Sequence, residues 1–147
     1  YFCETNEIVA RKAQAVLEQS LTPIICLGES LEQKEAGIAG DVIEEQFLNS
    51  VPENATVDNI IIAYEPVWAI GTGKVATLQD IIDIHSKIRE VSEKKLGSKD
   101  ITILYGGSVK PSNAEEVFST DEVNGVLVGG ASLKADDFWN IAMASVK

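Results

Sequence analysis

One acidic residue stands where a buried strand meets an unusual loop. Residues 60–64 form a continuous apolar run typical of a strand in a parallel sheet, and Glu65 follows it directly. The loop that comes next is apolar and then glycine-rich, over residues 66–76. Catalytic groups gather at the carboxyl ends of parallel strands, so Glu65 is a candidate acid or base beneath a lid that excludes water. The alternative is a structural salt bridge under a packed loop.

Three other apolar runs end in glycine-containing turns. These turns are Gly28-Glu29, Gly106-Gly107-Ser108 and Gly129-Gly130. Glycine lets backbone N–H groups approach a ligand closely, and a helix that starts just beyond adds a potential favourable to an anion. A single pair of glycines is explained by a tight turn. Three such turns beside one acid favour a site for a phosphate group.

The elements that must position these residues follow an alternating pattern. Apolar runs predict strands over residues 22–27, 60–64, 101–105 and 125–128. Helical patterns predict helices over residues 5–20, 41–49, 77–96, 112–118 and 136–146. Thr77 and Asp80 have capping-box spacing, and Gly97 ends the same helix. The alternation predicts one α/β domain, residues 1–147, whose parallel strands share one carboxyl edge.

Composition and isolated residues exclude several other functions. With a net charge of −11 and no basic run, the chain is a poor partner for nucleic acid or an anionic membrane. No apolar run approaches the length of a membrane span. Two separated cysteines and one histidine argue against a metal site. We expect Cys26 to be a small buried apolar residue and His85 to be a half-buried packing residue. Residues 71–74 resemble a nucleotide-binding P-loop only in part. Trp68 stands where that motif needs its first Gly, and Val75 stands where it needs Ser or Thr.

Four segments together are similar to one known family. Residues 63–74, residues 105–109 (Tyr-Gly-Gly-Ser-Val), residues 127–133 (Leu-Val-Gly-Gly-Ala-Ser-Leu) and residues 23–29 resemble motifs of triosephosphate isomerases, in the same order. The resemblance covers the whole chain. It implies a parallel (β/α)8 TIM barrel, of which this chain supplies the second half. It also implies interconversion of dihydroxyacetone phosphate and glyceraldehyde 3-phosphate, a step of glycolysis and gluconeogenesis, without cofactor or metal.

The resemblance also implies a role for each matching residue. Glu65 would be the catalytic base, and desolvation would strengthen it by favouring its neutral form. The substrate phosphate would be held by backbone N–H groups of Gly71, Ser108, Gly129 and Gly130. Cys26 and Glu29 also match the family pattern, and they would hold the site residues in place without contacting the substrate. The lid and the apolar clamp around the carboxylate would comprise Pro66, Val67, Trp68, Ile70, Thr72, Gly73, Lys74, Tyr105 and Leu127.

The chain also departs from the family pattern. The barrel has roughly 250 residues, and the Asn, Lys and His that the family contributes to the site from its first half have no counterpart here. The sequence starts without Met and resembles the interior of a longer protein. We therefore expect the chain to be inactive alone and to pair with the missing half or with a second copy of itself. The alternative is a half barrel with at most phosphate binding. The intact family member would be a cytoplasmic homodimer.

Overall fold

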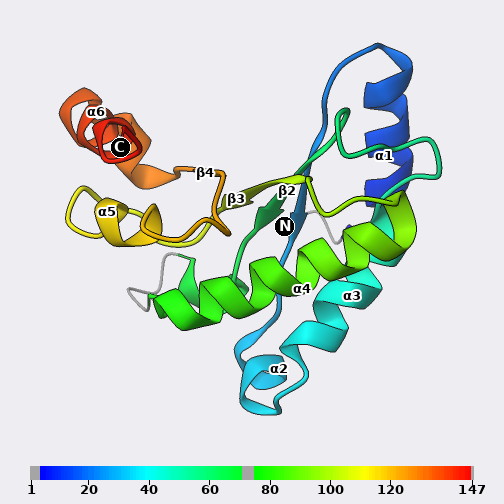
Figure 1. Ribbon diagram of the computed structural model, residues 1–147, viewed down its shortest axis with the longest axis horizontal. Coiled ribbons are helices and arrows are strands. Elements are labelled where there is room, and N and C mark those ends of the chain that lie inside the picture. Colours follow the sequence, from blue (N-terminus) through cyan, green and yellow to red (C-terminus); the bar gives the residue numbers. More distant parts are fainter. Residues whose placement is uncertain (1–3, 71–74, 147) are drawn as a thin grey trace.

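The computed structural model describes residues 4–70 and 75–146, which form helices packed around a sheet (Figure 1). Its α-helices are α1 (Asn6–Glu18), α2 (Leu31–Glu35), α3 (Ala39–Ser50), α4 (Leu78–Leu96), α5 (Ala114–Val117) and α6 (Ala135–Met143). Its strands are β1 (Ile24–Leu27), β2 (Ile61–Tyr64), β3 (Thr102–Tyr105) and β4 (Gly125–Val126). Two short 3-10 helices, η1 (Val67–Ala69) and η2 (Gly130–Leu133), follow the ends of β2 and β4.

All four strands are parallel and lie in the order β1-β2-β3-β4. The register pairs Leu27 with Tyr64 and Tyr64 with Tyr105. The next residues along these strands, Gly28, Glu65 and Gly106, therefore continue as a row at the carboxyl edge. The prediction of a parallel sheet with one shared carboxyl edge is confirmed.

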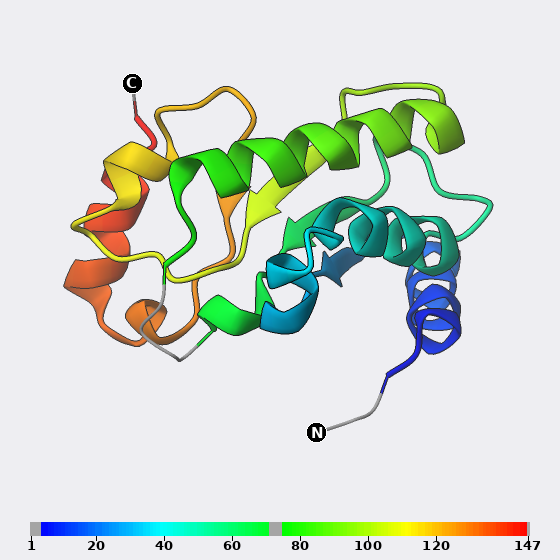
Figure 2. The same ribbon diagram turned by 90° about the horizontal axis from the view of Figure 1, so that it is seen from below.

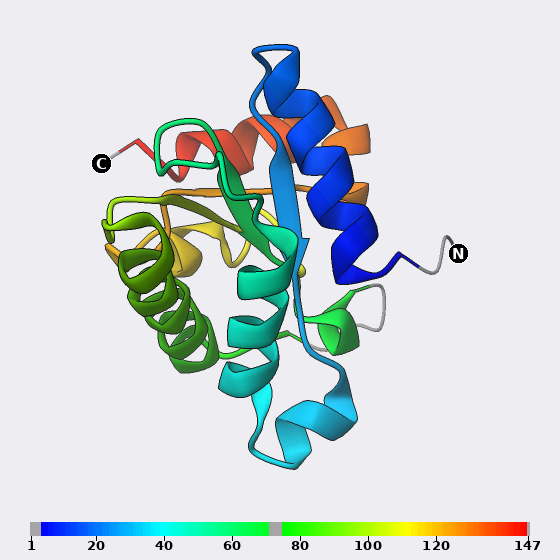
Figure 3. The same cartoon turned by 90° about the vertical axis from the view of Figure 1, so that its right-hand side faces the viewer.

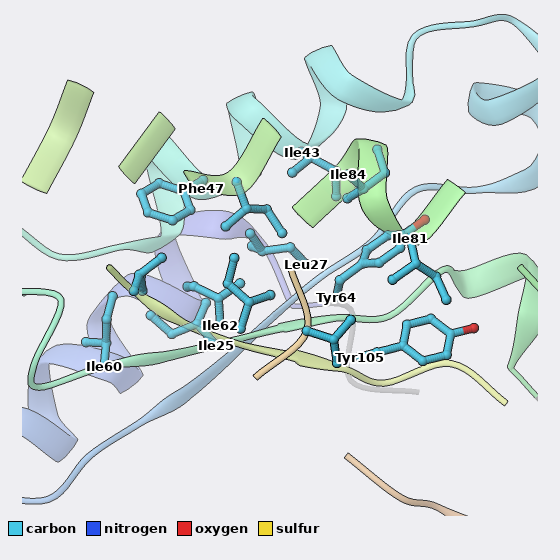
Figure 4. Close-up of a cluster of buried hydrophobic side chains, with 14 of the residues drawn as sticks. Ile25, Leu27, Ile43, Phe47, Ile60, Ile62, Tyr64, Ile81, Ile84 and Tyr105 are labelled. Atoms are coloured by element: carbon cyan, nitrogen blue, oxygen red, sulfur yellow. The ribbon is translucent and has the colours of Figure 1, made fainter. Parts of the chain in front are cut away.

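Helices cover one face of this sheet. Figure 3 shows α1, α3 and α4 arranged around the strands, with α1 to the right of β1 and α4 to the left. α3 packs against both α1 and α4. Alternate strand residues such as Ile25, Ile62 and Tyr64 point into this layer, where they pack against Ile43 and Phe47 of α3 (Figure 4). On β1 the alternation is complete, because Ile24 and Cys26 are exposed while Ile25 and Leu27 are buried. The opposite face of the sheet, which also carries Glu65 by alternation, is therefore the more open one.

Local sequence signals place the longest helix well. The Thr77 hydroxyl accepts from the Asp80 N–H, and the Asp80 carboxylate accepts from the Thr77 N–H, which completes the predicted capping box of α4. Gly97 ends the helix in the left-handed conformation, with φ of 81°. Both signals satisfy backbone groups that a helix end leaves without partners.

Other boundaries differ from the prediction. Helix α2 was not predicted, although Ser30 and Gln33 form a second capping box at its start. Strand β4 ends at Val126 rather than at residue 128, because only Gly125 and Val126 pair with β3 as regular strand. The closing helices are shorter than predicted as well.

Figure 2 shows α1 and α6 at opposite ends of the molecule. Among the described residues, no helix has the length and apolar character needed to cross a membrane.

Candidate active site

Glu65 sits between two glycines that make room for it. A Cβ atom on Gly28 would lie 1.8 Å from the backbone oxygen of Glu65. A Cβ on Gly106 would lie 2.5 Å from the Glu65 Cγ and 3.3 Å from its Oε1. The Glu65 side chain therefore lies over Gly106, toward β3 rather than away from it. We call Gly28, Glu65 and Gly106 the Glu65 seat.

Backbone and side-chain hydrogen bonds fix this seat. The Glu65 N–H donates to Leu27 O at 2.7 Å, and the Gly106 N–H donates to Tyr64 O at 2.8 Å. Gln46 of α3 holds both peptide groups of Gly28, accepting from its N–H at 2.8 Å and donating to its carbonyl at 2.9 Å. Sequence reasoning missed Gln46, since a polar residue on an amphipathic helix carries no local sign of a distant partner.

Cys26 lies beside Glu65 on the same face. The residue is exposed, so the prediction of a buried cysteine is wrong: its position in β1 faces the open side of the sheet. The protein atoms that crowd its thiol raise its pKa to about 12, and the charge of Glu65 and a hydrogen bond with that carboxylate add to the effect. The thiol is therefore neutral and serves as a donor beside the Glu65 carboxylate.

The start of the apolar loop is anchored on the other face, by Glu29. The Glu29 carboxylate is buried, with 1% of the residue exposed. Its Oε1 accepts from Trp68 Nε1 at 2.6 Å and from the Tyr64 hydroxyl at 3.1 Å, and its backbone oxygen accepts from the Val67 N–H at 3.1 Å. Burial raises the pKa of Tyr64, and the Glu29 charge raises it further, so Tyr64 stays a donor. Pro66 is buried and leads into η1, whereas Val67 and Ile70 are exposed.

The β3 turn contacts the same loop. The Ser108 hydroxyl donates to Ala69 O at 2.8 Å, which joins the turn after β3 to η1. Tyr105 is fully buried, and burial raises its pKa to about 12, opposed by the backbone N–H of Ala76. Gly107 is needed for this ring, because a Cβ there would lie 2.1 Å from the Tyr105 hydroxyl. Tyr105 thus reaches the far end of the loop while Ser108 reaches its beginning.

The end of β4 has a different character. The Leu127 N–H donates to Tyr105 O at 3.0 Å, which keeps this segment in line with β3. Gly129 and Gly130 are exposed, and a Cβ on either would meet no protein atom within 4 Å. Gly130 begins η2, and a helix start leaves N–H groups without partners inside the helix. Gly71, Thr72, Gly73 and Lys74, predicted as phosphate and lid residues, lie outside the described residues.

His85 lies behind the sheet and not at its carboxyl edge. It is fully buried rather than half-buried, because α4 packs it directly beneath Tyr64, with ring centroids 5.8 Å apart. Its Nδ1 lies 2.9 Å from Glu122 O, a carbonyl that accepts, so Nδ1 carries the proton. Burial lowers the pKa of His85 to about 4, the Glu122 contact opposes this, and the Arg89 charge adds to it. His85 is a neutral core residue.

The described residues gather three of the predicted groups around one edge. Glu65, the Ser108 turn and the Gly129-Gly130 turn follow β2, β3 and β4 at the carboxyl end of the sheet. A carboxylate that can take a proton thus lies on the same edge as exposed backbone groups that can bind an anion. Across residues 4–70 and 75–146, no three or more His, Cys, Asp or Glu side chains are placed to hold a metal ion.

Comparisons of this chain with known proteins agree with the family resemblance seen in its sequence motifs. A family model described as "Triosephosphate isomerase" matches residues 1–145. The triosephosphate isomerase of Hyphomonas neptunium is 52% identical over 140 residues, a match that covers 94% of this chain and 56% of that relative. That of Alkaliphilus oremlandii is 47% identical over 147 residues, covering 96% and 59%.

A solved structure matches as well. The crystal structure of triosephosphate isomerase from Bartonella henselae superposes with a TM-score of 0.89 at 44% identity, covering 98% of this chain and 58% of that one. The four parallel strands and their helices correspond to half of a (β/α)8 barrel. The chain spans a little over half the length of the relatives it matches. Within that span, both sequence and fold show that it belongs to the triosephosphate isomerase family.

Proposed function

We propose that Glu65 is the proton-transfer base of a triosephosphate isomerase, in a barrel that this chain completes together with a first half. The observation that carries the proposal is the Glu65 seat, which holds one carboxylate over Gly106 at the carboxyl edge of a parallel sheet. The base removes a proton from one carbon of the triose phosphate and returns it to the neighbouring carbon. A second proton passes from the hydroxyl oxygen to the former carbonyl oxygen, a transfer that this proposal leaves to groups of the first half. Dihydroxyacetone phosphate and glyceraldehyde 3-phosphate are thereby interconverted, as glycolysis and gluconeogenesis require.

The substrate phosphate is assigned to the backbone N–H groups of Ser108, Gly129 and Gly130, with Gly71 as a further expected contact. Support comes from the open space around Gly129 and Gly130 and from the helix start at Gly130. Backbone donors bind an anion without side-chain charge, which reconciles a phosphate ligand with a chain of net charge −11.

The apolar loop is assigned the role of lid. Its beginning is anchored by Glu29 and Ser108, and its far end faces Tyr105. Exposed Val67 and Ile70 offer apolar surface that can close over the substrate, and Leu127 from the end of β4 completes the clamp. Closure would remove water from the Glu65 carboxylate and strengthen it as a base.

The partner in this proposal is the first half of the family's barrel. It would supply the substrate-binding Lys and the His that polarises the carbonyl, neither of which has a counterpart in this chain. β1 and β4 are the edge strands of the described sheet, and each offers an unpaired edge to a neighbouring strand. Alone, the chain is expected to bind phosphate at most. The proposal includes a cytoplasmic homodimer for the completed enzyme, on the ground of family membership.

A chimera tests the catalytic assignment. The part of the Bartonella henselae enzyme that this chain does not match is fused before residue 1, and turnover of glyceraldehyde 3-phosphate is measured in a coupled assay. The chimera should be active and the 147-residue chain alone should not. Glu65→Gln should reduce kcat by about 10³-fold, because general acid–base catalysis is worth about 10² to 10⁴.

Glu90→Gln is the matched control, since Glu90 is an exposed acid on α4. It should leave kcat unchanged. A folded chimera without turnover, or a Glu65→Gln chimera as active as its parent, contradicts the proposal. Turnover by the chain alone would show that the first half contributes nothing essential.

A further inference from the structure

The side chain of Gln46 binds a strand residue as a neighbouring strand would. Gln46 is half-buried on α3, on the same face of the helix as the buried Ile43 and Ser50. Its Oε1 accepts from the Gly28 N–H at 2.8 Å, and its Nε2 donates to the Gly28 carbonyl at 2.9 Å. A carboxamide carries an acceptor and a donor together, as a peptide group does. Gln46 therefore satisfies both backbone groups of Gly28 at once.

These two hydrogen bonds lie on the side of β1 that faces away from β2. Peptide groups of successive residues in a strand point toward opposite neighbours. The carbonyls of Leu27 and Glu29 accept from backbone N–H groups at the end of β2 and in η1, so both face β2. The peptide groups of Gly28, between them, face the edge of β1 that has no neighbouring strand among the described residues. Gln46 fills that position, and the end of β1 is thus held from both sides.

The position of Gly28 in turn determines the position of Glu65. A Cβ on Gly28 would lie 1.8 Å from the Glu65 backbone oxygen and 2.7 Å from its carbonyl carbon, so the two backbones lie in direct contact. Close-packed atoms transmit a displacement to their neighbours. Gln46 and Glu65 also border the same cavity of about 250 Å³, together with Gly28 and Cys26. Any movement of Gly28 is therefore passed to the residue that carries the carboxylate.

We propose that Gln46 is a positioning residue for the reaction, a role that rests on the proposed function of Glu65. By holding Gly28 against the Glu65 backbone, Gln46 fixes the point from which the carboxylate reaches the substrate carbon. The backbone groups assigned to the phosphate follow β3 and β4, on the other side of Glu65. Gln46 therefore affects proton transfer and leaves substrate binding unchanged.

Gln46→Met in the chimera described above tests this role. Methionine has nearly the length of glutamine but does not replace its N–H donor and carbonyl acceptor, so both backbone groups of Gly28 lose their partner. We expect kcat to fall about 10-fold, since misplacement of a catalytic group by about 1 Å can cost about 100-fold. KM should stay within about twofold of the parent value. Gln14→Met is the matched control, because Gln14 is exposed on α1 and its amide donates to Glu18 of the same helix. It should leave kcat unchanged.

A double variant shows whether Gln46 acts through the Glu65 carboxylate. In a chimera that already carries Glu65→Gln, adding Gln46→Met should lower kcat by less than about twofold, because the group to be positioned is gone. A merely structural defect would lower kcat by the same factor in both backgrounds. Urea unfolding of each variant shows that the assayed chains are folded.

Gln46→Asn keeps the amide and decides the matter if the methionine variant does not fold. Its side chain is one methylene shorter, so it should retain at most one of the two hydrogen bonds and lower kcat about two- to fivefold. Unchanged kcat in a folded Gln46 variant, or an equal loss with and without the Glu65 carboxylate, would overturn the role of Gln46 while the proposed function stands. A parent chimera without turnover would instead contradict the proposed function, and with it the reaction that Gln46 is proposed to serve.

Discussion

A Cβ atom added to Gly28 or Gly106 would collide with protein atoms, whereas a Cβ added to Gly129 or Gly130 would point into open space. At the Glu65 seat, any side chain in place of either glycine would collide with Glu65 itself. At the end of β4, a Cβ would touch nothing in the described chain. The first pair is required by the protein's own packing, and the second is compatible with a molecule that arrives from outside. Similar glycine turns on neighbouring strands thus carry different constraints.

Gly28→Ala should show the largest effect. The new Cβ would meet backbone atoms of Glu65 that cannot move away without breaking the hydrogen bond from the Glu65 N–H to Leu27 O. We expect the free energy of unfolding to fall by more than about 3 kcal/mol, beyond the usual cost of overpacking. Urea unfolding of the full chain followed by circular dichroism measures it.

Gly40→Ala provides the control. A Cβ on Gly40 would lie 3.9 Å from the Lys87 side chain, an ordinary contact, and Gly40 is inside α3. Alanine favours helix and should leave the stability equal or higher. Equal stabilities for Gly28→Ala and Gly40→Ala would remove the distinction between the two kinds of glycine.

Much of the fold was predictable because its signals are local. The Thr77 capping box, the Gly97 stop and the alternation of strands with helices each depend on residues close in sequence. Helix α2 carried the same kind of signal in Ser30 and Gln33, and it was missed for its short length. These elements follow from hydrogen bonds that the chain forms within a few residues.

The site was predictable only in part. The order of parallel strands was enough to place Glu65 and the glycine turns at one edge. The register that sets Gly28 and Gly106 on either side of Glu65 is a long-range property, and so is the contact of Gln46 with Gly28. The same reason explains Cys26, whose exposure depends on which face of β1 the helices cover. Distant partners leave no trace in a short stretch of sequence.

Lowering the pH should reduce the free energy of unfolding, because His85 is buried as a neutral ring in the packed layer between α4 and the sheet. The pKa of His85 is about 4 in the folded chain and about 6.5 when unfolded. Because the folded pKa is the lower one, the stabilising contribution is complete above about pH 6.5 and is lost as the pH falls toward 4. The difference corresponds to about 3 kcal/mol.

Urea unfolding at several pH values, for the unchanged chain and for His85→Asn, measures this contribution. The variant loses the titrating ring and should show a flatter dependence between pH 6.5 and pH 4. Only the change with pH is compared, since the substitution alters packing by itself. Parallel curves for the two chains would show that His85 does not titrate in this range.

Gly106→Ala separates positioning from stability at the Glu65 seat. Its Cβ would meet the Glu65 Cγ, a side-chain atom that can swing aside, so the stability should fall less than in Gly28→Ala. The displaced carboxylate should reduce kcat of the chimera about 10- to 100-fold, as misplacement of a catalytic group does. Unchanged kcat in a folded variant would mean that the orientation of Glu65 over Gly106 has no part in the reaction.

Gly130→Ala should have the smallest effect on the fold and a selective effect on binding. The residue begins η2, and its Cβ would point into open space, so the free energy of unfolding should change by less than about 0.5 kcal/mol. If the substrate phosphate approaches this backbone N–H, the added methyl group should raise KM of the chimera about tenfold while kcat changes less. An unchanged KM would place the phosphate elsewhere on the edge, and a large loss of stability would show that the protein itself requires this glycine.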